Sequence, residues 1–166
     1  IECTPSSILI TSGAQQALHL IIQCLLKPGD AVAIEDPSYT YSLPIFRSLG
    51  IKTILLEVDE NGVNPNDIHN AYINHRIRMI FLSPAYQNPT GGVLHPERRK
   101  KILKTAYEFG IPIVEDDPYS LLSFEKSAAT LKSEDSHGVV IYISSLSKMV
   151  SSGIRIGWIL APRQII

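Results

Sequence analysis

Apolar and polar positions form blocks along the chain that predict helices and strands in turn. Over residues 14–25 apolar side chains recur every three or four positions, which predicts a helix with one buried face that ends at residues 27–30. The same spacing follows Pro96 and predicts a helix over residues 96–110. Weaker patterns predict helices over residues 38–49 and 65–75.

Short apolar runs lie between these helical patterns and predict strands. The expected strands cover residues 31–35, 52–58, 78–83, 111–115, 139–144 and 156–161. Strands that alternate with helices indicate a layered α/β fold with a largely parallel sheet. Ligands of open α/β sheets bind beyond the carboxyl ends of the strands, so a site is expected at the turns near residues 36, 84, 116 and 145.

Composition and charge argue against nucleic-acid-binding and membrane-spanning functions. The 166 residues are 45% hydrophobic and 19% charged, with 15 basic and 16 acidic side chains, which is typical of one soluble globular domain. This balance offers no basic surface for nucleic acid, and the run 98–101 would circle a helix and form no common patch. No apolar stretch approaches the roughly 18 residues of a membrane span, and no leader pattern is seen, so a cytoplasmic protein is expected.

The two cysteines and five histidines form neither a CxxC nor an HxxxH pair. No metal or redox site is therefore expected. Cys24 lies seven residues after Ala17 in the first helical pattern, which predicts that it packs in the core.

Two motifs could bind an anion and a flat ring. Ser12 and Gln15 fit a capping box around Gly13, and the free N–H groups of that helix start could hold a phosphate. A capped helix without a ligand explains the same residues. Tyr39, after a predicted strand and Asp36, could offer its face to a planar ring, although a surface or core tyrosine is the simpler interpretation.

Two further motifs follow later strands. Two prolines and two glycines fix the loop 83–92, in which Asn88 offers both a donor and an acceptor. Three adjacent carboxylates occupy residues 115–117 before Tyr119, a costly arrangement unless a positive group lies nearby. An exposed acidic turn is the alternative.

The last motif combines hydroxyl groups with two cations. Ser145, Ser147 and Lys148 follow an expected buried strand, and Arg155 comes seven residues after the lysine. A loop lysine is usually only solvated. The cluster would nevertheless suit a phosphate held beside a reactive amine.

These five motifs, in this order, resemble those of the fold-type I pyridoxal-phosphate aminotransferases of class I/II. The resemblance runs from Ile10 to Pro162 and is closest to the aminoadipate/kynurenine aminotransferases and the aminotransferase-like domains of MocR-type regulators. It implies a mixed, mostly parallel sheet flanked by helices. It also implies a cytoplasmic, homodimeric transferase of a biosynthetic process that moves an amino group from an amino acid to a 2-oxo acid. The alternative is the effector-sensing domain of a MocR/GntR-type transcriptional regulator.

The resemblance also assigns roles at the reacting end of the cofactor, pyridoxal 5'-phosphate. Lys148 would form the Schiff base with its aldehyde and then carry the proton in transfer. Asp116 would pair with the pyridine nitrogen, and it is preferred over Asp117 because the family spacing is Asp-x-x-Tyr. Tyr119 and Asn88 would hydrogen-bond the phenolic oxygen of the ring.

The remaining roles concern the ring face and the phosphate. Tyr39 would stack on the ring. The phosphate would be held by a set of backbone and side-chain donors, namely Gly13, Ala14, Gln15, Ser145, Ser147 and Arg155. Many relatives have a hydroxyl residue where Ala14 stands, so this contact is reduced to the backbone.

The resemblance finally implies more chain than the 166 residues contain. Relatives carry an N-terminal arm and a C-terminal small domain that supplies an arginine for the substrate carboxylate. Residues 1–166 are therefore expected to be part of the cofactor-binding large domain, and to be inactive alone.

Overall fold

A computed structural model describes residues 1–39, 43–124 and 129–166. Part of the helix predicted over residues 38–49 falls on residues 40–42, outside the described residues. Eight strands form one sheet in the order β1-β8-β7-β6-β5-β2-β3-β4. The strands are β1 (Ile8–Thr11), β2 (Ala31–Asp36), β3 (Lys52–Asp59), β4 (Gly62–Val63), β5 (Met79–Leu82), β6 (Ile113–Asp116), β7 (Val140–Ser145) and β8 (Gly157–Leu160).

The sheet is mixed and mostly parallel, which confirms the predicted fold class. Strands β3, β2, β5, β6 and β7 run parallel, and Ile34 of β2 lies between Leu55 and Phe81 of its neighbours. At one edge β8 is antiparallel to both β7 and β1, and at the other edge β4 is antiparallel to β3. The parallel order puts the carboxyl ends of β2, β5, β6 and β7 along one edge of the sheet.

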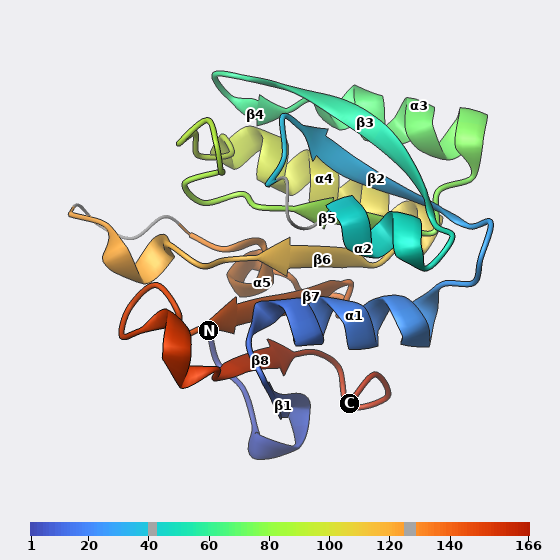
Figure 1. Cartoon of the computed structure of the whole chain (residues 1–166). Coiled ribbons are helices and arrows are strands. Elements are labelled where there is room, and N and C mark those ends of the chain that lie inside the picture. Colours follow the sequence, from blue (N-terminus) through green and yellow to red (C-terminus); the bar gives the residue numbers. More distant parts are fainter. Residues whose placement is uncertain (40–42, 125–128) are drawn as a thin grey trace.

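Helices cover both faces of the sheet (Figure 1). Helices α1 and α2 pack on one face over a core that includes Ile21 and Phe46, and α3, α4 and α5 pack on the other over a core that includes Ile68 and Ile102. The helices are α1 (Ala14–Leu25), α2 (Leu43–Ser48), α3 (Pro65–His75), α4 (Pro96–Phe109) and α5 (Leu131–Glu134), with short 3-10 turns at Pro5–Ser7, Ser120–Leu122 and Ser152–Ile154. Within the described ranges, none of these helices is long and apolar enough to cross a membrane.

Helix α4 shows how local sequence sets the bounds of an element. Pro96 occupies the first turn, where its missing N–H costs nothing, and the His95 ring accepts a hydrogen bond from the Glu97 N–H at 3.3 Å. At the other end Gly110 adopts a left-handed φ of 64°, and its N–H donates to carbonyl groups of the last turn. These signals explain why both ends match the sequence prediction.

Three local features differ from the sequence predictions. Strand β1 was not predicted, because it is an edge strand in which only Thr11 is buried and its partner β8 lies far away in sequence. Cys24 is exposed and not in the core, because the buried positions of α1 step from Leu18 to Ile22 and on to Leu26, the C-cap residue, and do not include Cys24. Arg99 is not a solvated surface residue: it is only 7% exposed and forms an ion pair with Glu134 at 3.1 Å.

Candidate active site

A cavity of about 300 Å³ lies at the edge of the sheet where the parallel strands end. Ten of the eleven predicted site residues line it: Ala14, Gln15, Tyr39, Asn88, Asp116, Tyr119, Ser145, Ser147, Lys148 and Arg155. The eleventh, Gly13, does not line the cavity, and a Cβ atom added there would meet the guanidinium of Arg155. Segments more than a hundred residues apart therefore meet in one place, as the strand-end argument predicts.

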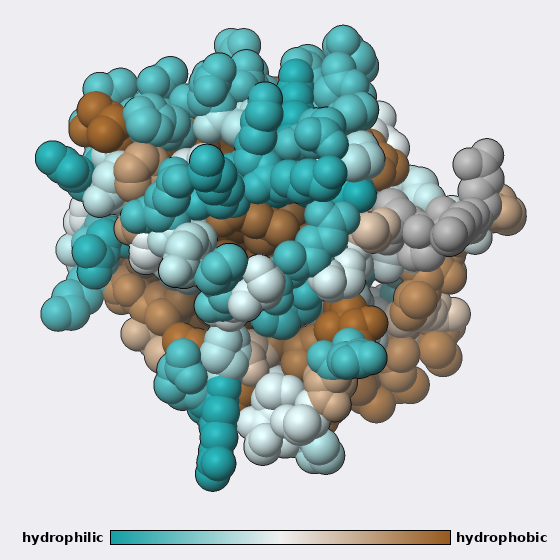
Figure 2. All heavy atoms as spheres, turned by 180° about the vertical axis from the view of Figure 1, so that it is seen from behind, coloured by the Kyte–Doolittle hydropathy of each residue, from teal (hydrophilic) through white to brown (hydrophobic). Residues whose placement is uncertain are grey.

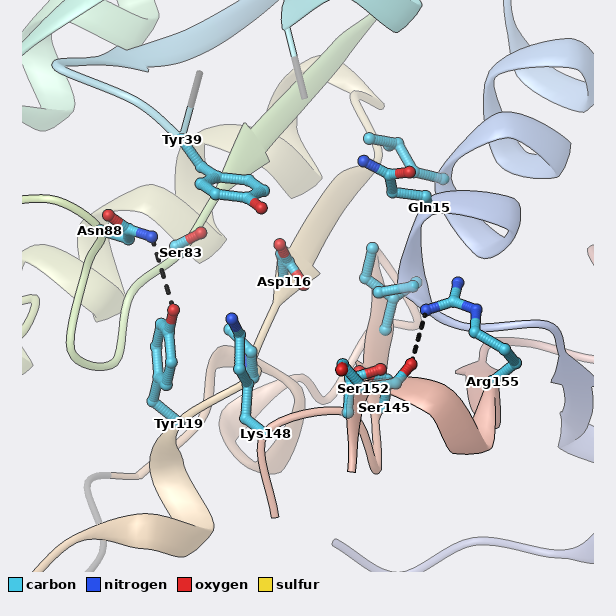
Figure 3. Close-up of a pocket in the computed structure, with 15 residues that line it drawn as sticks. Gln15, Tyr39, Ser83, Asn88, Asp116, Tyr119, Ser145, Lys148, Ser152 and Arg155 are labelled. Atoms are coloured by element: carbon cyan, nitrogen blue, oxygen red, sulfur yellow. Dashed lines mark hydrogen bonds between the residues drawn. The ribbon is translucent and has the colours of Figure 1, made fainter. Parts of the chain in front are cut away.

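The lining side chains divide the cavity into two ends (Figure 3). Asn88 and Tyr119 lie at one end, where the Asn88 amide donates to the Tyr119 hydroxyl at 3.4 Å. Arg155 and Ser145 lie at the opposite end, with Asp116 between the two. Lys148 extends its amine into the same space from the turn after β7.

Asp116, the last residue of β6, has a side-chain oxygen without a partner. Among the described residues, its Oδ1 is the one buried side-chain polar atom that has no hydrogen bond. Burial, and then the charge of Asp117, raise the pKa of Asp116 to about 7. A buried carboxyl oxygen without a donor is costly, and Asp116 lines the cavity, so the site is suited to a ligand that brings a donor.

The neighbouring acids, in contrast, have partners within the fold. Glu115 is fully buried and accepts two backbone N–H groups at the start of α5, each at 2.8 Å. Asp117 is 2% exposed and accepts hydrogen bonds from Ser120 and from the Tyr142 hydroxyl. The alternative of an exposed acidic turn is therefore wrong, and Asp116 alone of the three lines the cavity.

The start of α1 differs in detail from the predicted capping box. Gly13 is the N-cap and has no side chain to close the first turn. The Ser12 N–H is satisfied instead by Gln16, whose Oε1 accepts at 2.6 Å. Gln15 is thereby left to line the cavity with Ala14. The N–H groups of a first helical turn have no partner within the helix, so they are available to an anion.

Arg155 adds a full positive charge to this end of the cavity. It adopts a left-handed backbone with φ 51°, and its guanidinium donates to the Ser12 carbonyl at 2.8 Å. This contact holds the cation beside the start of α1. Ser145, at the end of β7, is 4% exposed. The arrangement of cation, hydroxyl and helix start is suited to a phosphate.

Five lining residues were not among the predicted site residues. They are Leu18, Ser83, Pro118, Ile143 and Ser152. Ser83, Pro118 and Ser152 stand inside the motifs described above, and Leu18 lies one helical turn after Ala14. The position of Ile143 follows from the end of its strand, but nothing in its residue type points to a site.

A buried acid behind the cavity was also missed. Glu35 is 5% exposed, and its carboxylate accepts the Ser83 N–H at 2.8 Å. Burial raises the pKa of Glu35 to about 7, although hydrogen bonds from Ser83 and Gln87 lower it in part. A glutamate that closes an apolar strand pattern could have been noticed, but its burial depends on the packing of the following loops.

The sequence matches the family described as Aminotransferase class I and II over residues 1–166. It is 41% identical to an uncharacterized HTH-type transcriptional regulator, YdfD of Bacillus subtilis, over all of this chain and 35% of the regulator. Its fold matches kynurenine aminotransferase of Pyrococcus horikoshii, solved with PMP, at a TM-score of 0.90 and 34% identity, over 95% of this chain and 41% of that one. It also matches the α-aminoadipate aminotransferase LysN of Thermus thermophilus, solved with N-(5'-phosphopyridoxyl)-L-leucine, at 0.90 and 35%, over 96% and 42%. The chain thus spans well under half the length of these relatives.

Proposed function

This chain belongs to the class I and II aminotransferase family, and we propose that it binds pyridoxal 5'-phosphate and serves the transfer of an amino group between an amino acid and a 2-oxo acid. The observation that carries the proposal is Asp116, which lines a cavity that a lysine also enters and has a buried Oδ1 without a hydrogen-bond partner. The protonated pyridine nitrogen of this cofactor is a donor of the kind that Asp116 lacks. The residues present therefore fit the cofactor of the family.

The cofactor, when bound, supplies an electrophilic aldehyde and a ring that accepts electrons from the substrate. Lys148 would hold it covalently through its amine, and the same amine would serve as the base for the proton of the substrate carbon. Asp116 would stay ionised beside the ring nitrogen and hold the proton there. Because burial favours the neutral acid, the paired positive charge is what would keep this carboxylate ionised at neutral pH.

The other predicted residues would orient the cofactor without exchanging protons with the substrate. Asn88 and Tyr119 would bond the phenolic oxygen, and Tyr39 would cover one face of the ring. The backbone N–H groups of Ala14 and Gln15 would bind the phosphate at the positive end of α1. Further phosphate donors would be Gly13 of the same turn, the hydroxyls of Ser145 and Ser147, and Arg155.

Trapping the covalent link tests this assignment in the intact protein. After incubation with pyridoxal 5'-phosphate and reduction with borohydride, peptide mass spectrometry should find the cofactor on Lys148. Lys148→Ala should lose both the label and the visible absorption of the bound cofactor, while the phosphate donors still allow weaker binding. Lys104→Ala, on the solvent side of α4 with Glu108, is the control and should keep both signals. A label on another lysine would overturn the assignment.

A second candidate function rests on a specific observation. The 41% identity to an HTH-type regulator covers the whole chain, so the same site could serve as a sensor whose ligand controls DNA binding by another domain. The intact reading frame separates the two candidates by the presence or absence of a DNA-binding domain. An assay of amino transfer to 2-oxoglutarate by the intact protein gives the functional answer, since a sensor would bind without turnover.

We also propose that the whole protein acts as a homodimer in the cytoplasm. Three exposed apolar side chains lie in the two turns that bear Tyr119 and Lys148: Leu121 is 67% exposed, Leu122 44% and Val150 65%. A second copy would cover such side chains, which seldom form large exposed patches on monomeric proteins. Sedimentation of the intact protein tests this assembly.

A further inference from the structure

Gly157, the first residue of β8, lies where three segments of the proposed phosphate site meet. It pairs with Thr11 at the end of β1 on one side and with Ser145 at the end of β7 on the other. Helix α1 starts three residues after Thr11, and Arg155 comes two residues before Gly157. The strand register therefore connects the helix start, the serine and the arginine to this one position.

The backbone of Gly157 packs directly against the backbone of Gly13 and Ala14. A Cβ atom at position 157 would lie 2.6 Å from the Gly13 carbonyl carbon, 2.8 Å from its Cα and 2.9 Å from the Ala14 nitrogen. Non-bonded carbon atoms normally keep about 3.5 to 4.0 Å apart. All three neighbours are main-chain atoms, so none can turn away as a side chain could. Only glycine allows β8 to approach the start of α1 this closely.

Gly13 in turn leaves room for the Arg155 side chain. Its φ of 89° is a left-handed value that favours glycine, and a Cβ there would overlap Nη2 of Arg155 and lie 3.0 Å from its Cζ. The guanidinium uses this space to reach the Ser12 carbonyl at 2.8 Å. The absence of two side chains thus allows strand, helix start and arginine to lie against one another.

We infer that the contact between Gly13 and Gly157 is a positioning device for the anion-binding end of the site. Gly157 is then a positioning residue: it sets the N–H groups of Ala14 and Gln15 against the donors of Ser145 and Arg155 without touching the phosphate itself. The inference rests on the proposed function, because it concerns the phosphate of the same cofactor. Oriented donors lose much of their effect when displaced by about 1 Å. A methyl group added at position 157 should therefore weaken the binding of the phosphate.

A comparison of two ligands, one with a phosphate and one without, distinguishes this positioning role from a general loss of structure. Dissociation constants of the intact protein are measured for pyridoxal 5'-phosphate and for pyridoxal, which lacks the phosphate. Gly157→Ala should weaken the phosphorylated ligand about tenfold or more and change pyridoxal by less than about twofold. Gly153→Ala is the matched control from the same segment, because its Cβ would meet only the Ser151 hydroxyl at 3.7 Å, and both constants should stay unchanged.

The inference would be overturned if folded Gly157→Ala lost affinity equally for both ligands, or lost affinity for neither. If circular dichroism finds that variant unfolded, a crystal structure of the intact wild-type protein with inorganic phosphate decides. The anion should contact the Ala14 and Gln15 N–H groups, Ser145 and Arg155 while Gly157 stays packed on Gly13 without touching it, and a direct bond from Gly157 to the phosphate would refute the positioning role. A wild-type protein without preference for the phosphorylated ligand would contradict the proposed function itself.

Discussion

Glu35 shows how a single buried acid couples this fold to pH. An ordinary glutamate has a pKa of 4.5, and burial raises that of Glu35 to about 7 in the folded chain. Between these two values the folded state binds a proton that the unfolded state has released. The contribution of Glu35 to stability is therefore complete below the unfolded pKa and is lost as the pH rises through the folded one.

Glu35→Gln should remove this part of the pH dependence. The amide oxygen can still accept the Ser83 N–H, but the side chain no longer has to lose a proton. Between about pH 5 and about pH 8 the wild-type free energy of unfolding should fall more steeply than that of the variant, by on the order of 3 kcal/mol. Urea denaturation at both pH values, without cofactor, measures the difference. Parallel pH profiles would show that Glu35 is ionised throughout this range.

At the residue scale, the sequence indicated most of the site but not the acid behind it. Asn88, Asp116 and Lys148 are visible because each stands in a motif directly after a predicted strand. Glu35 also ends a predicted strand, but its burial depends on the Ser83 backbone and on Gln87, about 50 residues away in sequence. No local pattern holds this information.

At the scale of elements, the turn after β6 is held by buried polar contacts. Asp117 accepts the Tyr142 hydroxyl of β7 at 2.9 Å and also bonds Ser120, while the Ser144 hydroxyl donates to the Asp117 carbonyl at 2.6 Å. These bonds fix the backbone between Asp116 and Tyr119. The two proposed cofactor contacts therefore depend on β7 for their spacing.

Tyr142→Phe should loosen this turn. It removes a buried hydrogen bond to a carboxylate, worth about 2 kcal/mol, and leaves the acid with one donor fewer. We expect that loss in the free energy of unfolding, measured by urea denaturation, together with weaker binding of pyridoxal 5'-phosphate. Tyr107→Phe, in which the hydroxyl of a 54% exposed tyrosine on α4 is removed, serves as the control and should change neither quantity. A fully stable Tyr142→Phe would mean that the bonds from Ser120 and Ser144 are enough to hold the turn.

Elements with a continuous buried pattern were predicted best, for a physical reason. Helix α4 and strand β7 bury continuous patterns over several turns or residues, and both follow the sequence prediction within two residues. Strands β1 and β4 and helix α5 span only two to four residues each and were not predicted. Length alone is not the reason, since β5, β6 and β8 also span four residues each and were predicted. Strand β1 forms because β8, distant in sequence, holds it, so the local pattern carries little of its stability.

At the scale of the whole molecule, one face of the sheet is thinly covered. Ile8, Tyr142 and Leu160 line a hollow on the face of β1, β7 and β8 opposite α1, and Ile10 beside it is 66% exposed. Seen from behind, hydrophobic atoms gather in the lower right of the molecule, whereas the upper part is mainly hydrophilic (Figure 2). Surfaces of this kind normally contact further protein.

The 166-residue chain alone should therefore bind cofactor poorly and transfer no measurable amino group. It spans 35% to 42% of the relatives compared, and the resemblance to this family assigns the arginine that clamps the substrate carboxylate to a small domain outside residues 1–166. Orientation by such clamps accounts for a large share of an enzyme's rate, so its loss is severe even where Lys148 and Asp116 are in place. The chain is incubated with cofactor, an amino-acid panel and 2-oxoglutarate, and glutamate formation is followed, with the intact protein as the positive control. Turnover close to that of the intact protein would mean that the described cavity already contains everything the reaction requires.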